Sequence, residues 1–207
     1  DGARPAPAAE APAIPAPVVG PAFTIAVLGD NIGIMLAQGL QETFANQPNV
    51  TILRKARENT GLVRDDYFDW TKAARDLVAS PERIDAIVLM LGSNDRQALR
   101  DGAASVDTRL PRWRELYAER AQNLARILRE NNVPLLWVGM PVMKNERLST
   151  GLLELNEIYR ETASQNGATY IDVWEAFVDD RQQFALYGPD LNGAITKQRA
   201  GDGVHFT

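Results

Sequence analysis

The chain has 207 residues, of which 45% are hydrophobic and 24% are charged, and these values suit one α/β domain rather than two. Its net charge of -5 and its scattered basic residues argue against a nucleic-acid surface, because phosphate binding needs a positive patch. The absence of cysteine excludes disulfides, zinc-thiolate sites and cysteine nucleophiles, and no apolar run is long enough to be a transmembrane segment. A neutral or sugar-like ligand therefore fits best.

Residues 1–21 consist mainly of Ala and Pro, a composition that cannot bury enough apolar surface to offset its ordering entropy. We predict a flexible or polyproline-like tail over residues 1–21 and one folded domain over residues 22–207. A tether of this kind often remains after an export signal or membrane anchor has been removed, so we expect a periplasmic or otherwise exported protein. An ordinary cytosolic linker is the alternative.

After the tail, apolar runs bounded by turn residues alternate with stretches of helical period, a pattern typical of βαβ units and a parallel sheet. In chain order, strands are predicted over Phe23–Leu28, Val50–Arg54, Ala86–Leu91, Pro134–Gly139 and Thr169–Val173. Helices are predicted over Gly33–Ala45, Trp70–Val78, Arg112–Asn131 and Thr150–Asn166. Irregular loops near one face are expected over residues 55–69, 96–110 and 179–207. The sequence thus predicts a three-layer α/β/α sandwich around a parallel sheet of about five strands.

Ligands of such sheets bind beyond the carboxyl ends of the strands, so the segments after the first and third strands are candidate sites. Residues 29–33, Gly-Asp-Asn-Ile-Gly, pass directly into a helix whose first N–H groups favour an anion or oxyanion, although they also suit an ordinary turn and cap. Residues 92–95, Gly-Ser-Asn-Asp, place the Asn94 amide where it either donates into the cleft or bonds its own backbone. Gly61 is a plain loop glycine on its own, and no nucleotide-binding motif occurs.

His205 is the only histidine in the chain, so any imidazole-dependent chemistry must use it. Asp202 lies three residues earlier on a glycine-containing turn, where its carboxylate can fix the tautomer of the ring and support its positive charge during proton transfer. A lone histidine is more often merely satisfied within a fold. Only carboxylates remain as metal ligands, and we predict no metal site.

These segments, in this order, resemble the blocks of the SGNH (GDSL-like) hydrolases: G-D-S after the first strand, a loop glycine, G-x-N-D after the third strand and D-x-x-H near the carboxyl end. Here they stand as Gly-Asp-Asn at 29–31, Gly61, Gly-Ser-Asn-Asp at 92–95 and Asp-Gly-Val-His at 202–205. The resemblance covers about residues 23–207 and implies the flavodoxin-like SGNH hydrolase fold. Residues 61–70, 94–97 and 202–207 further resemble an uncharacterised, mostly exported branch of that family from Gram-negative bacteria.

The resemblance implies that His205 is the general base, oriented by Asp202, and that the N–H groups of residue 31 and Gly61 form an oxyanion hole with the Asn94 side chain. Members of the family hydrolyse or transfer acyl groups from esters, often acetyl groups on glycans, through a serine acyl-enzyme and without a cofactor. We therefore expect a small-molecule or glycan acyl ester as partner, whereas the sequence does not indicate an oligomeric state. Possible substrate-lining residues, each of which could equally be solvated or capping, are Asp30, Arg64, Asp66, Trp70, Asp95, Arg96 and Gln97.

Asn31 stands where the resemblance requires serine. An amide has no ionisable hydroxyl, so His205 has nothing useful to deprotonate, and losing the serine of such a triad costs about a millionfold in turnover. We therefore expect little or no activity. Ser93 is a poor substitute, because its position in the family block is that of a spacer.

Two interpretations stay open: an active hydrolase scaffold whose serine has been replaced, and a natural pseudoenzyme that binds a glycan or another ligand or serves in assembly. A third, a flavodoxin-like nucleotide binder, requires the four blocks to be coincidental. The hydrolase geometry predicts that the side chains of Asn31 and His205 lie within about hydrogen-bond reach. The family usually continues into a final helix after the D-x-x-H block, so with Thr207 as the last residue we expect either a further segment or a less well anchored His205 loop.

Overall fold

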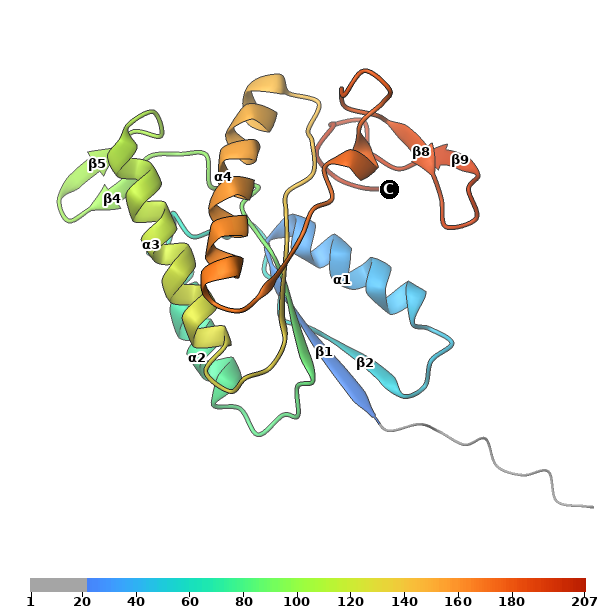
Figure 1. Cartoon of the computed structure of the whole chain (residues 1–207), viewed down its shortest axis with the longest axis horizontal. Coiled ribbons are helices and arrows are strands. Elements are labelled where there is room, and N and C mark those ends of the chain that lie inside the picture. The colour runs from blue at the N-terminus through green and yellow to red at the C-terminus, as the bar shows by residue number, and fades with distance from the viewer. Residues whose placement is uncertain (1–21) are drawn as a thin grey trace, which may run out of the picture.

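A five-stranded parallel sheet runs through the centre of the computed structural model, which describes residues 22–207 (Figure 1). Its neighbours follow the order β2-β1-β3-β6-β7, and every adjacent pair is parallel. The strands are β1 (Phe23–Gly29), β2 (Val50–Arg54), β3 (Ala86–Met90), β6 (Leu135–Val138) and β7 (Thr169–Ile171). The predicted tail over residues 1–21 lies outside the described residues.

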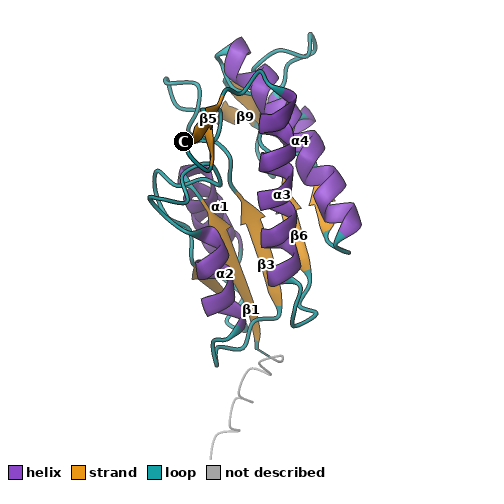
Figure 2. Cartoon of the chain, turned by 90° about the vertical axis from the view of Figure 1, so that its left-hand side faces the viewer, coloured by secondary structure: helices purple, strands orange, loops and turns teal. Residues whose placement is uncertain are grey.

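Helices cover both faces of the sheet, in unequal number (Figures 1 and 2). One face carries α2 (Trp70–Val78), α3 (Pro111–Leu128) and α4 (Glu146–Gln165), and the other carries α1 (Asn31–Thr43). Because β3 lies between the two layers, all of its residues are buried, which explains its uninterrupted apolar sequence. The three-layer sandwich predicted from the sequence is therefore confirmed. Within residues 22–207, no helix combines the length and apolar character that crossing a membrane would require.

An apolar groove of about 430 Å³ lies on the face that α1 covers alone, between this helix and the last residues of the chain. It is lined mainly by Ile32, Met35, Leu36, Met90, Val138, Val173, Phe177 and Phe206. The groove thus borders both the first residues of α1 and the segment that carries His205.

Two helices begin earlier than predicted because side chains cap them. Asp30 accepts a hydrogen bond of 3.0 Å from the Ile32 N–H, so α1 begins at Asn31 rather than at Gly33. The side chain of Asn145 caps α4 by the same type of contact, with the amide of the third helical residue as donor, and the helix begins four residues before the predicted start. The prediction also carried α3 three residues too far, since it ends at Leu128.

Two of the segments predicted to be irregular contain short antiparallel hairpins, and this part of the prediction was wrong. β4 (Leu99–Asp101) pairs with β5 (Ala104–Val106), and β8 (Tyr187–Pro189) pairs with β9 (Ile195–Lys197). The turns contain Asp-Gly and Asn-Gly, whose glycines, residues 102 and 193, have φ values of 60° and 81°. Such dipeptides are strong hairpin signals, and they could have revealed both hairpins.

Candidate active site

The loops that follow β1, β2 and β3 meet at the carboxyl edge of the sheet. Asn31 begins α1, and its Oδ1 accepts a hydrogen bond of 2.8 Å from the backbone N–H of Asn59. Asn94, after β3, donates from Nδ2 to the carbonyl oxygen of Thr60 at 3.1 Å. The segment that contains Gly61 is therefore held between the two other blocks, so three of the four sequence blocks come together.

Asp30 is a buried carboxylate that ties the first block to the third. It is 0% exposed, and Oδ2 accepts hydrogen bonds from the Gly92 and Ser93 amides at 2.9 and 2.8 Å and from the Ser93 hydroxyl at 2.8 Å. Burial raises its pKa, and these hydrogen bonds oppose the rise. Asp30 does not line a substrate cleft as expected, because no solvent-accessible surface remains on it, and the Ser93 hydroxyl is engaged with it.

A second buried carboxylate, Asp95, holds the loop that contains Gly61 in place. It is 0% exposed and accepts hydrogen bonds from the Leu62 and Val63 amides at 3.0 and 3.1 Å and from the Tyr117 hydroxyl at 2.6 Å. Burial raises the pKa of Asp95 to about 6. A Cβ at Gly61 would lie 1.9 Å from Asp95 Oδ1, so the carboxylate can approach only a glycine. Asp95 is therefore a buried loop anchor, and the expectation that it lines the substrate was wrong.

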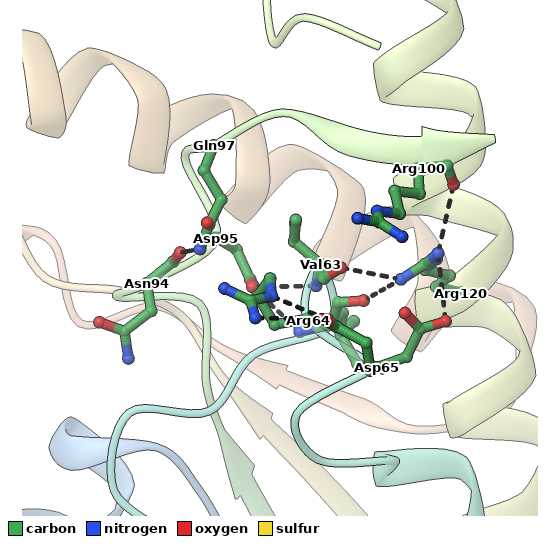
Figure 3. Close-up of polar contacts among 10 residues, drawn as sticks. Val63, Arg64, Asp65, Asn94, Asp95, Gln97, Arg100 and Arg120 are labelled. Carbon is green, nitrogen blue, oxygen red and sulfur yellow. Dashed lines mark hydrogen bonds and ion pairs between the residues drawn. The ribbon is translucent and has the colours of Figure 1, made fainter. Parts of the chain in front are cut away.

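Arg120, on α3, closes the loop from the other side. Its guanidinium donates to the carbonyl oxygens of Leu62 and Val63 and forms an ion pair of 3.2 Å with Asp65. Figure 3 shows Asp95 and Arg120 reaching the Val63 backbone from opposite sides. Sequence reasoning missed Arg120, because nothing in the local pattern of α3 distinguishes it from the other arginines of that helix.

The remaining predicted lining residues differ in exposure. Arg64 is exposed and pairs with Asp66 at 2.7 Å, so both are accessible to a ligand. Arg96 stacks on Trp113 with its guanidinium carbon 4.9 Å from the ring centroid, and it forms an ion pair of 2.8 Å with a glutamate of α4. Trp70 is only 2% exposed and packs in the core, but it borders a hollow of about 300 Å³ next to Gly61, so its place in the lining stays a prediction.

The fourth block forms a tight turn around one carboxylate. Asp202 Oδ2 lies 2.7 Å from Nδ1 of His205, while Oδ1 accepts hydrogen bonds from the Val204 and His205 amides at 2.9 and 3.0 Å. The hydrogen bond from His205 holds the pKa of Asp202 well below its usual range. The carboxylate is therefore charged at neutral pH. Within residues 22–207, no hydrogen bond involves the other ring nitrogen of His205, Nε2.

The first and last blocks do not join directly. Among the described residues, no hydrogen bond links the side chains of Asn31 and His205, and the Asn31 oxygen is engaged with Asn59. The expected direct contact is thus not formed, and a separation of one bridging water stays a prediction. No group of three or more histidine or acidic side chains within residues 22–207 is placed to hold a metal ion.

Comparisons with known proteins agree on the architecture. The sequence matches the family described as "Protein of unknown function (DUF459)" over residues 24–207, and the curated proteins contain no match. Among solved structures, TesA is 16% identical, with 89% of each chain covered and a TM-score of 0.58. AlinE4, an SGNH-hydrolase family esterase, is 16% identical, with 84% of this chain and 89% of that chain covered and a TM-score of 0.56. A member of the lipolytic protein G-D-S-L family from Veillonella parvula DSM 2008 is 14% identical, with 90% of each chain covered and a TM-score of 0.60.

Proposed function

Because the chain belongs to the DUF459 family and has the fold of the SGNH hydrolases, we propose that it is an acyl-ester hydrolase or acyltransferase scaffold with Asn31 at the nucleophile position. The observation that carries the proposal is the pair formed by Asp202 and His205, 2.7 Å apart. A carboxylate on Nδ1 leaves Nε2 as the basic nitrogen, which is the arrangement that general-base catalysis needs.

Three donors supply the oxyanion hole in this proposal. The backbone N–H groups of Asn31 and Gly61 have no acceptor among the described residues, and Asn94 uses only one hydrogen of its amide on Thr60. The Asn31 N–H also lies at the start of α1, where the helix dipole favours negative charge. The anchoring of the neighbouring loops by Asp30 and Asp95 supports preorganised donors of the kind that stabilise a developing oxyanion.

Asn31 silences the chemistry in this proposal. Its amide cannot be deprotonated by His205, so no acyl-enzyme forms, and residual turnover is limited to what the oxyanion hole and substrate binding provide. The hydrogen bond from Asn59 to the Asn31 oxygen gives the side chain a structural role instead. That bond favours the second candidate function, a natural pseudoenzyme that serves as a glycan-binding or assembly module.

An acyl ester of a cell-envelope glycan is the substrate class that we propose. A hollow of about 410 Å³ borders Asn59 and is lined by charged side chains and the exposed ring of Tyr67, a surface that suits hydroxyl-rich ligands. The Ala- and Pro-rich composition of residues 1–21 supports a place of action outside the cytoplasm.

Hydrolysis of p-nitrophenyl acetate tests the proposal. We expect Asn31→Ser to raise turnover by several orders of magnitude over the parent, and Asn31→Ser/His205→Ala to return it to the parent value. Asn31→Ala is the matched control, since it removes the Asn59 contact without adding a hydroxyl. An inert Asn31→Ser protein that keeps its fold would contradict the hydrolase scaffold and favour the binding module.

A further inference from the structure

Arg199 is a basic side chain buried directly behind the turn that carries His205. It is 0% exposed, and within residues 22–207 no other lysine or arginine is buried. Within residues 22–207, no carboxylate forms an ion pair with it, and the charge of Asp202 offsets only part of the effect of burial on its pKa. Burial lowers its pKa to about 10, so it remains charged at neutral pH. A buried charge without an ionic partner is costly, and it calls for a compensating role.

Three phenylalanine rings surround the guanidinium. Its central carbon lies 4.6 Å from the ring centroid of Phe206, 4.9 Å from that of Phe184 and 5.7 Å from that of Phe177. Aromatic faces attract a desolvated cation, which compensates part of the lost hydration. The rings also exclude water and hold the planar group in one orientation.

The hydrogen bonds of Arg199 join two separate loops. Nη1 donates to the carbonyl oxygen of Val142, after β6, at 2.8 Å. Nη2 donates to the carbonyl oxygen of Val204 at 3.0 Å and approaches that of Gly203 at 3.5 Å. Val204 directly precedes His205. The guanidinium therefore connects the loop after β6 to the backbone of the turn that carries His205.

We propose that Arg199 is a positioning residue that sets the orientation of the His205 ring by fixing the carbonyl groups of its turn. The proposal rests on the proposed function for the role of His205 in catalysis. The Asp202 and His205 side chains are 50% and 41% exposed, so few contacts restrain them on their solvent-facing side. Arg199 restrains the turn from its buried side, together with the Lys144 amide, which donates to the Gly203 carbonyl oxygen. A less well anchored His205 loop was one of the two expectations from the sequence. A lysine keeps the charge but lacks the planar fork that reaches both loops.

The lone histidine makes a direct test possible, because all imidazole signals in a nitrogen-correlated NMR spectrum belong to His205. In the protein as it stands, we expect one tautomer with the proton on Nδ1, facing Asp202. In Arg199→Gln, both tautomers should be populated, and exchange of the Ala200 amide, which donates to the His205 carbonyl oxygen, should accelerate by at least about tenfold. Arg199→Lys should lie between the two.

Arg129→Gln is the matched control. Arg129 also donates to backbone carbonyl oxygens, those of Val133 and Asn166, at the opposite end of the sheet. We expect this variant to leave the tautomer and the Ala200 exchange rate unchanged.

A second readout uses the Asn31→Ser background, where Arg199→Gln should lower kcat about a hundredfold while KM changes by less than about twofold. The NMR readout needs no turnover, so an inert Asn31→Ser protein would contradict the proposed function without touching this inference. A folded Arg199→Gln protein with an unchanged tautomer and unchanged exchange would overturn the inference. Loss of the whole fold in both Arg199 variants, seen as loss of the buried-tryptophan emission, would also overturn it, because Arg199 would then be a general core residue.

Discussion

The loops after β2 and β3 are held by buried carboxylates, whereas the turn that carries His205 is held by a buried guanidinium, so the anchoring charges have opposite signs. Asp30 and Asp95 accept hydrogen bonds from backbone N–H groups of neighbouring loops. Arg199 instead donates to backbone carbonyl oxygens. In this turn Asp202 binds the amides of Val204 and His205, and backbone amides donate to the carbonyl oxygens of Gly203 and His205, which leaves the Val204 carbonyl oxygen to the guanidinium.

The contrast shows that the sign of a buried anchor follows the backbone group that lacks a partner, since unpaired N–H and carbonyl groups are both costly to bury. The carboxylates Asp95 and Asp202 also differ in how they are connected to the core. Asp95 is integrated with the core through the Tyr117 hydroxyl, which contacts the Tyr159 hydroxyl at 2.8 Å. Asp202 lies at the surface. We therefore expect changes near Asp95 to alter stability and changes at Asp202 to alter catalysis.

The largest effect on the free energy of unfolding is expected for Gly61→Ala. The new Cβ would meet Asp95 Oδ1 at 1.9 Å, and the carboxylate cannot move without losing its bonds to the loop. Overpacking and strained hydrogen bonds together should destabilise the protein by about 4 kcal/mol. Urea unfolding at pH 7 measures the loss.

Gly39→Ala is the matched control for this prediction. Nothing lies within 4 Å of a Cβ at Gly39, which is in the middle of α1, so the substitution should be neutral or stabilise by up to about 1 kcal/mol. The double variant with Asp95→Ala sharpens the test, because shortening the carboxylate should relieve most of the cost of Gly61→Ala. Additive losses in the double variant would contradict the steric explanation.

A smaller effect is expected from the pH dependence of stability. The pKa of Asp95 is about 6 in the folded chain and 3.8 ordinarily, so the folded state binds the proton more tightly. Its contribution to stability is full below about pH 4 and is lost as the pH rises through about 6. The difference in unfolding free energy between the parent and Asp95→Asn should therefore change by about 3 kcal/mol across that range.

Unfolding curves of both proteins at pH 4, 5, 6 and 7 measure this change. The raised pKa of Asp30 cancels in the difference only in part, because the charge of Asp30 also raises the pKa of Asp95 and the two carboxylates are coupled. A difference that stays constant with pH would mean that Asp95 is ionised in the folded chain throughout, and the inferred desolvation would be wrong.

Much of this contrast could not be predicted from the sequence. The apolar runs predicted where the five strands lie, and the spacing of Asp202 and His205 predicted a contact that the structure contains, because both depend on residues close together in the sequence. The role of Arg199 depends on Val142, 57 residues away, and no local pattern encodes such a contact. Asp95 follows a strand like an ordinary turn residue. Its burial depends on α3, which comes later in the sequence and brings the Tyr117 hydroxyl against it.

The smallest effect on stability is expected for Asp202→Asn. The pKa of Asp202 lies below its usual range, so its contribution is present at neutral pH and disappears only as the pH falls through that lowered value. Because the side chain is half exposed, solvent screens the interaction, and we expect no measurable shift of the urea midpoint at pH 7. In the Asn31→Ser background, however, turnover should fall by about four orders of magnitude, since the ring loses the carboxylate that sets its tautomer.

Asp107→Asn is the matched control, because Asp107 is another exposed carboxylate whose pKa is lowered, chiefly by the hydrogen bond from Arg109. It should change neither the urea midpoint nor the turnover by more than about twofold. If Asp202→Asn instead destabilised the fold as strongly as changes at Asp95, the turn would belong to the cooperative core. The two regions would then differ in the sign of their anchors but not in what those anchors do.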